Sequence, residues 1–168
     1  MRFGMSLSML ALCAVFGGIG FSSAQVPASK GQVEIQDVRV LMSKMGPVVL
    51  LTAQERVVPI FVDPTVAGSI DSALRGTSLS RPLSHDLMHT ILQEFGGTVL
   101  RANISLKGEV YYGELEVSIK GDRKVFDSRS SDAIALAIHF QAPIYVDQAL
   151  FEQANREEST NRDVPPTL

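Results

Sequence analysis

One short segment limits the possible folds more than any other: residues 131–140 are expected to form a helix that is apolar almost all round. A helix without a polar face has to be buried on every side. The side chains that give it this character are Ala133, Ile134, Ala135, Leu136, Ala137 and Ile138. The rest of the chain must therefore supply the layers that cover this helix.

The remaining sequence alternates between strand and helix patterns. Apolar residues spaced mostly two apart predict strands. A three-stranded meander is expected from the strands at residues 33–43, 48–51 and 57–62. Further strands are expected at residues 98–106, 110–119, 125–127 and 144–146. Helical spacing predicts helices over residues 66–74, stopping at Gly76, over residues 84–95, ended by Gly96-Gly97, and weakly over residues 148–154. The pattern predicts one compact α+β domain of mostly antiparallel strands with about three to four helices.

The N-terminus has the form of a secretory signal peptide. Arg2 is followed by an apolar stretch over residues 5–19 and by Ser22-Ser23-Ala24, a small-x-small cleavage site. An uncleaved membrane anchor is the alternative, but serines and glycines interrupt this stretch, which falls short of about 20 continuous apolar residues. Lipidation is not expected, because Leu12 rather than a small residue precedes Cys13. We therefore expect cleavage after Ala24 and an exported, periplasmic or secreted protein that is not attached to a membrane.

Cleavage leaves residues 25–168 as the mature chain, whose composition limits its possible chemistry. Residues 25–154 are expected to form the domain, and the polar residues 155–168, with Pro165-Pro166, a disordered tail. The only cysteine is lost with the signal, which excludes disulfides, thiolate metal sites and nucleophilic cysteine chemistry. Loss of Arg2 changes 15 basic against 18 acidic residues into 14 against 18, a net charge of −4. This balance argues against a tight, general nucleic-acid binder.

Two clusters of polar residues stand at predicted helix starts: residues 81–87, Arg-Pro-Leu-Ser-His-Asp-Leu, and residues 127–133, Asp-Ser-Arg-Ser-Ser-Asp-Ala. The free N–H groups and positive dipole end of a helix N-terminus favour phosphate. The same residues have a purely structural interpretation. Ser84 and Ser130 can be N-caps, with Asp86 and Asp132 near the second helical position, and such capping needs no ligand.

These clusters also carry a family resemblance. The two runs, followed by Ala-Pro-Ile-Tyr-Val at residues 142–146 and preceded by Val-Pro-Ile-Phe-Val at residues 58–62, resemble the bifunctional nuclease (BFN) domain family over about residues 33–154. The resemblance implies RNase or DNase activity, which is ascribed to some members. Three places depart from the usual pattern. The family usually has Ile-Gly followed by a Glu-Ala pair, whereas this chain has Val62-Asp63 followed by Val66-Ala67. In addition, Ser130 replaces Pro and Ser84 replaces Thr.

If the domain is a nuclease, the resemblance and the side-chain chemistry together indicate roles for six residues. His85 is the candidate base, Asp86, Asp127 and Asp132 are candidate catalytic carboxylates that orient water or hold Mg²⁺ or Mn²⁺, and Arg81 and Arg129 would bind phosphate. Nucleic acid is then a weakly bound partner, and a homo-oligomer stays open. The rival interpretation is a non-catalytic exported domain that kept the fold, in which Arg129 pairs with a carboxylate such as Asp127.

A separate pattern is His85-Asp86-Leu87-Met88-His89, which has the spacing of the zinc-binding motif His-Glu-x-x-His with Asp in place of Glu. Histidines at positions i and i+4 lie on one helix face and could bind zinc. The shorter Asp and the lack of an identifiable third ligand argue against a metalloprotease. A solvent-facing histidine pair is the simpler expectation.

Overall fold

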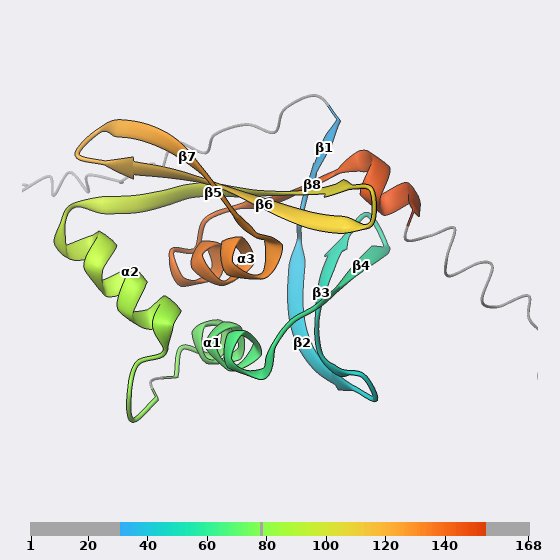
Figure 1. Ribbon diagram of the computed structural model, residues 1–168, viewed down its shortest axis with the longest axis horizontal. Coiled ribbons are helices and arrows are strands. Elements are labelled where there is room, and N and C mark those ends of the chain that lie inside the picture. The colour runs from blue at the N-terminus through green and yellow to red at the C-terminus, as the bar shows by residue number, and fades with distance from the viewer. Residues whose placement is uncertain (1–30, 78, 154–168) are drawn as a thin grey trace, which may run out of the picture.

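The computed structural model describes residues 31–77 and 79–153. They form two sheets and three labelled helices, with a further helical segment at residues 148–153 (Figure 1). This is the predicted α+β class. The expected signal peptide and C-terminal tail lie outside the described residues. Within the described part of the chain, no helix is long and apolar enough to cross a membrane.

The larger sheet has five strands in the order β1-β8-β5-β6-β7. Their bounds are β1 Gln32–Glu34, β8 Ile144–Asp147, β5 Gly97–Lys107, β6 Val110–Ile119 and β7 Asp122–Arg129. All neighbours are antiparallel except β5 and β8, which run parallel. The predicted predominance of antiparallel pairing is confirmed, and β7 is longer than the short strand that was expected.

The smaller sheet is the predicted meander, formed by β2 (Asp37–Ser43), β3 (Gly46–Ala53) and β4 (Arg56–Phe61). The single strand expected at residues 33–43 was wrong, because the chain changes sheets inside it. The N–H of Ile35 donates to the carbonyl of Ile144 in the larger sheet at 2.8 Å, and the N–H of Gln36 donates to Thr52 in the smaller one at 2.8 Å. The first residues of this segment therefore belong to β1 and the later ones to β2.

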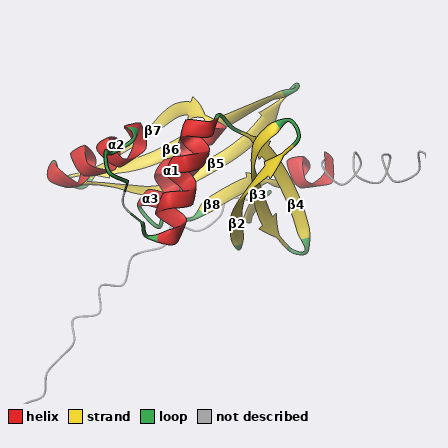
Figure 2. Ribbon diagram, turned by 90° about the horizontal axis from the view of Figure 1, so that it is seen from below, coloured by secondary structure: helices red, strands yellow, loops and turns green. Residues whose placement is uncertain are grey.

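The helices α1 (Pro64–Arg75), α2 (Ser84–Glu94) and α3 (Ser130–His139) lie on one side of the five-stranded sheet (Figures 1 and 2). α3 lies between this sheet and α1, and its residues 133–137 are all buried. This confirms the prediction from its sequence. Because α3 follows directly on β7, the end of that strand and the start of the helix form one continuous segment.

α2 departs from its sequence pattern, because most of its apolar stripe is not covered. The side chains of this stripe with large exposed fractions are Leu87 (52%), Met88 (43%), Ile91 (48%) and Phe95 (63%). The buried residue of α2 is His85. Helical periodicity correctly predicted the helix, but of its apolar face Leu92 packs against the core and the other four side chains are largely exposed.

Candidate active site

The starts of α2 and α3 are built in the same way, with an aspartate at the third helical position. The expected N-caps Ser84 and Ser130 were wrong by one residue: Leu83 and Arg129 occupy these positions, and neither side chain makes a capping hydrogen bond. In α2 the carboxylate of Asp86 accepts a hydrogen bond from the Leu83 N–H at 2.8 Å. Asp86 therefore helps to hold the start of its own helix.

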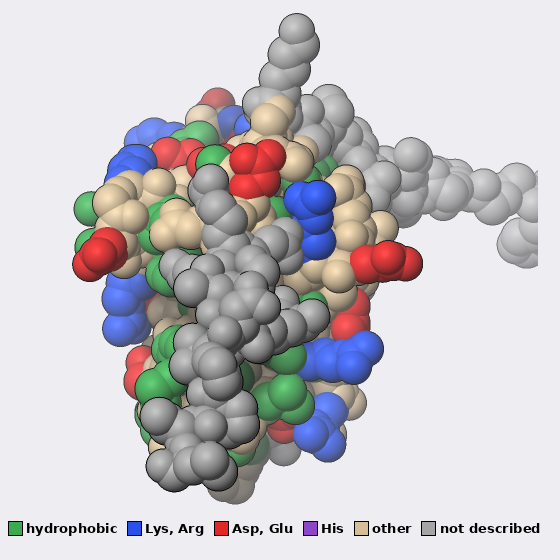
Figure 3. Space-filling model, turned by 90° about the vertical axis from the view of Figure 1, so that its right-hand side faces the viewer, with side chains coloured by type: hydrophobic (Ala, Val, Ile, Leu, Met, Phe, Trp, Pro, Cys, Tyr) green, Lys and Arg blue, Asp and Glu red, His purple; other side chains and the backbone are tan. Residues whose placement is uncertain are grey.

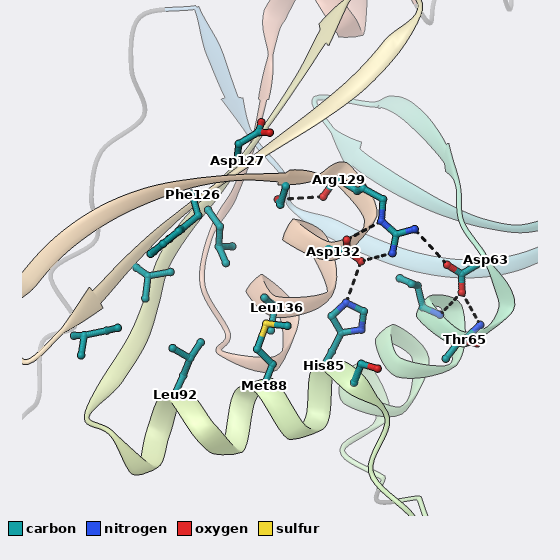
Figure 4. A pocket seen from close by; sticks show the side chains of 16 residues that line it. Asp63, Thr65, His85, Met88, Leu92, Phe126, Asp127, Arg129, Asp132 and Leu136 are labelled. Carbon is teal, nitrogen blue, oxygen red and sulfur yellow. Dashed lines mark hydrogen bonds and ion pairs between the residues drawn. The ribbon is translucent and has the colours of Figure 1, made fainter.

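In α3 the equivalent carboxylate, Asp132, reaches to other elements. It accepts two hydrogen bonds from the Arg129 guanidinium, Nε to Oδ2 at 2.8 Å and Nη2 to Oδ1 at 3.0 Å. The Nε2 atom of His85, on α2, lies 3.2 Å from the same Oδ1. The remaining guanidinium nitrogen, Nη1, lies 3.9 Å from a carboxylate oxygen of Asp63, before α1. One network thus joins the starts of all three helices (Figure 4).

The charges of this network favour the ionised form of Asp132. Burial by itself would raise the pKa of the Asp132 carboxyl, but the hydrogen bonds and charge of Arg129, together with His85, outweigh burial and lower it. The Asp132 carboxylate in turn raises the pKa of Arg129 by hydrogen bonding and by its charge. At neutral pH the site therefore contains an ionised carboxylate against one imidazole nitrogen, and His85 is nearly buried, with 6% of its surface exposed.

The network forms the polar end of a pocket of about 630 Å³. α2 forms one wall and β6, β7 and α3 form further walls, and Asp63, Thr65 and Val66 at the start of α1 also line the pocket (Figure 4). The polar lining residues are Asp63, Thr65, Ser84, His85, Asp127, Ser128, Arg129 and Asp132, and the apolar ones are Val66, Met88, Leu92, Leu115, Val117, Ile119, Phe126 and Leu136. Such a pocket, mainly apolar with a few convergent polar groups, has the size and composition typical of ligand sites.

The pocket brings together half of the six residues that the sequence singled out. His85, Arg129 and Asp132 converge on its polar end. Asp127 belongs to the lining, but its carboxylate points away from the other three (Figure 4). Arg129 therefore pairs with Asp132 rather than with Asp127. Asp86 and Arg81 are not among the lining residues, and Arg81 lies exposed in the loop before α2.

Asp63 is the residue of this site that the sequence analysis did not assign. Its Oδ1 accepts hydrogen bonds from the N–H groups of Thr65 and Val66, both at 3.0 Å, and so caps α1. Its other oxygen faces Arg129. The signal was available, since an Asp followed by Pro at a helix start is a strong N-cap pattern. Asp63 supplies a carboxylate close to Val66, the position where the family pattern has Glu.

The two histidines of the zinc-like pattern go to different partners. His85 meets Asp132, whereas His89 packs edge-on against Phe140, with ring centroids 4.5 Å apart, and lies 5.7 Å from His139. The expectation of a solvent-facing pair is therefore wrong for His85, which is buried. Among residues 31–77 and 79–153, no group of three or more His, Cys, Asp or Glu side chains is arranged to hold a metal ion.

The fold and the pocket define a small α+β domain with a histidine-aspartate pair at one end of an apolar cleft. The family model of the bifunctional nuclease domain matches residues 48–159, and the chain belongs to this family. It is also 30% identical over 128 residues to an uncharacterized protein found in two strains of Mycobacterium tuberculosis, covering 74% of this chain and 76% of that protein.

Proposed function

We propose that this BFN-domain protein is exported and hydrolyses phosphodiester bonds of RNA or DNA at the pocket between α2 and β7. The observation that supports this most is the placement of His85, which is bonded to Asp132 and lies beside Arg129 at the polar end of an open pocket. A base, a group that orients it and a phosphate-binding cation are the parts that such a reaction needs.

The ring of His85 has one nitrogen engaged and one available. Nε2 faces Asp132, and among the described residues no hydrogen bond to Nδ1 is formed. Nδ1 would accept a proton from the attacking water, while Asp132 fixes the ring and stabilises the imidazolium that forms. Arg129, whose side chain is 69% exposed, retains N–H groups that can donate to phosphate oxygens.

The residues present do not fit a resident Mg²⁺ or Mn²⁺ ion. Asp63 and Asp132 are the carboxylates nearest to the polar end, but Asp132 is bonded by Arg129 and His85, and Asp63 accepts from the α1 backbone and faces Arg129. The proposed hydrolysis therefore relies on His85, Asp132 and Arg129. The two carboxylates also outnumber the single guanidinium, so a phosphodiester should bind weakly and with strong salt sensitivity.

The mature chain expected after cleavage has a net charge of −4, so its overall charge does not attract a long polyanion. On the face shown in Figure 3, which is the side of the molecule that carries β2–β4 in Figure 1 and lies away from α2, basic and acidic side chains are interspersed. We therefore expect slow hydrolysis at low ionic strength.

The test is hydrolysis of labelled RNA and DNA oligonucleotides by protein purified away from host nucleases, in EDTA, Mg²⁺ and Mn²⁺. Asp132→Asn keeps the shape of the side chain but weakens its hold on His85 and Arg129, and should reduce the rate at least about 100-fold. The matched control is Asp71→Asn, which removes a carboxylate of an exposed ion pair with Arg75 on α1. Asp127→Asn should resemble this control, because the Asp127 carboxylate points away from His85.

A second candidate is a non-catalytic exported domain, and one observation favours it. The charged groups of the network already bind each other, and in doing so they connect α1, α2 and the β7–α3 segment. A wild-type protein without hydrolysis under any of these conditions, combined with a lower melting temperature of Asp132→Asn, would support this alternative and refute the nuclease proposal.

A further inference from the structure

The candidate pocket is apolar over most of its length, and the proposed hydrolysis uses only its polar end. The side chains that line the rest are Val66, Met88, Leu92, Leu115, Val117, Ile119, Phe126 and Leu136. None of them carries a nitrogen or oxygen atom. Three are large and still open to solvent, with exposed fractions of 43% for Met88, 38% for Ile119 and 46% for Phe126. An apolar group that covers these surfaces removes them from water, which favours binding.

A nucleobase does not match this lining. The edges of a base carry hydrogen-bond donors and acceptors, and leaving them unpaired against apolar side chains opposes binding. The backbone of the central wall offers no replacement, because β6 is paired with β5 on one side and with β7 on the other. A nucleic acid held at the polar end would therefore leave the apolar part of the pocket empty. An aliphatic chain has no polar groups to satisfy and fits this lining.

The apolar part is long enough for one such chain. Leu115 and Ile119 both line the pocket and lie four residues apart on β6, which corresponds to roughly 13 Å, or about ten methylene groups. The whole pocket, with its polar end, has a volume of about 630 Å³, which is typical of a site for one small molecule. The dimensions favour a single alkyl chain.

The polar end carries charges of both signs. Arg129, whose side chain is 69% exposed, keeps further N–H groups beside those that donate to Asp132, and these can donate to a phosphate. The Asp63 side chain is 46% exposed, and its Oδ2 faces Arg129 at 3.9 Å. Two carboxylates against one guanidinium disfavour a ligand that is only an anion. A phosphodiester that also carries an ammonium group matches both signs.

The order of these groups along the pocket matches the order within such a ligand. Figure 4 shows Asp63 on the far side of Arg129 from the apolar side chains of Met88 and Leu92. A chain that fills the apolar part therefore meets Arg129 first and Asp63 beyond it. In a single-chain lipid with a phosphocholine or phosphoethanolamine head, the phosphate follows the chain and the ammonium group comes last.

We propose that the pocket binds a single-chain lipid with a zwitterionic phosphodiester head. Its chain lies between α2 and the β6–β7 pair, its phosphate lies at Arg129, and its ammonium group lies at Asp63. The inference rests on the proposed function only in placing a phosphodiester at Arg129, and the binding itself needs no hydrolysis. Lipid and nucleic acid then compete for the same guanidinium.

Calorimetric titration with alkylphosphocholines, each kept below its micelle concentration and in EDTA, tests the chain. The protein should bind one molecule per site, and Kd should fall about fourfold for each added methylene group. This gain should level off at about ten to twelve carbons, when the apolar part is filled. Absence of binding for every homologue, or an affinity that keeps rising at the same rate in longer chains, would overturn the proposal.

Two neighbouring residues of β7 provide a matched pair of variants for the position of the chain. Phe126 lines the pocket, whereas Val125 alternates with it, lies on the other face of the sheet and is 61% exposed. Phe126→Ser should weaken decylphosphocholine binding at least tenfold, and Val125→Ser should leave it unchanged. Circular dichroism melting curves check that both variants are folded. Equal affinities of the two folded variants would contradict binding in this pocket.

Asp63→Asn tests the head group, because Asn caps helices about as well as Asp and so preserves the start of α1. The variant should bind decylphosphocholine more weakly and decyl sulfate, a pure anion, more tightly, and a loss of folding cannot produce these opposite changes. Asp71→Asn, which alters an exposed ion pair on the same helix, should change neither affinity. Changes in the same direction for both ligands in Asp63→Asn, or a wild type that prefers decyl sulfate, would refute the head-group assignment. Lipid binding without hydrolysis of RNA or DNA would refute the proposed function alone, and hydrolysis without lipid binding would refute this inference alone.

Discussion

Gly113 on β6 offers a sharp test of how the site is assembled, because the first turn of α3 packs directly on it. A Cβ atom at this position would lie 2.7 Å from the carbonyl oxygen of Arg129 and 2.8 Å from the Cβ of Ala133. Both are shorter than real Cβ contacts, and one of the atoms is backbone. Gly113→Ala should therefore displace the start of α3, which carries Arg129 and Asp132.

Overpacking of this kind costs about 1–3 kcal/mol of the free energy of unfolding. For a domain of this size, that corresponds to a fall in melting temperature of roughly 4–12 °C. The matched control is Gly68→Ala in α1, where the nearest atom to the new Cβ is Leu83 Cδ1 at 3.9 Å, an ordinary contact. In a helix this change removes the cost of glycine and should stabilise the protein by about 0.5–1 kcal/mol.

Thermal and urea unfolding, followed by circular dichroism, would measure both variants. The two substitutions add the same methyl group, so opposite signs would reflect the helical backbone at Gly68 and the close contacts at Gly113. A Gly113→Ala protein as stable as the wild type would show that α3 does not pack against β6 as described, and the positions of Arg129 and Asp132 would then need revision.

Four other expectations can be checked directly. Leu136→Asp buries an unpaired carboxylate in α3 and should cost on the order of 4 kcal/mol, visible as loss of the folded state in urea titration. The pKa of Asp132 is lowered on folding, so its ionised form stabilises the protein above the unfolded pKa of about 4. This stabilisation is lost as the pH falls through the folded pKa. In Asp132→Asn the melting temperature should therefore decline less steeply at acid pH. Burial lowers the pKa of His139, so the free energy of unfolding should also fall as the pH drops below about 6.5. This fall, followed by the melting temperature, should be smaller in His139→Gln. N-terminal sequencing of exported protein should begin at Gln25, and an intact Met1 would refute signal cleavage.

Local sequence patterns predicted most elements of the fold, because helix and strand periodicity depend on near neighbours. β6 lies at Val110–Ile119, as its alternation indicated, and α3 is buried as its uniformly apolar surface requires. Gly76 ends α1 in the left-handed conformation that glycine tolerates. The family could also be inferred from short runs, since each run keeps its residues in a fixed order along the chain.

The candidate site was only partly predictable, because its geometry depends on which faces meet. His85, Arg129 and Asp132 were identified from the sequence, and Asp127 was grouped with them because it is a carboxylate in the same short run that carries the family resemblance. Strand alternation and the turn from β7 into α3 direct its carboxylate elsewhere (Figure 4).

The sequence by itself determined the types of element, the buried helix and the family, since these follow from residue order over short distances. Only the tertiary structure decided that α2 leaves its apolar stripe open and that Asp63 joins Asp132 around Arg129. Asp63 and Asp132 are far apart in the chain and meet because α1 and α3 pack together. A contact of this kind depends on the packing of whole elements, and no local pattern of residues encodes it.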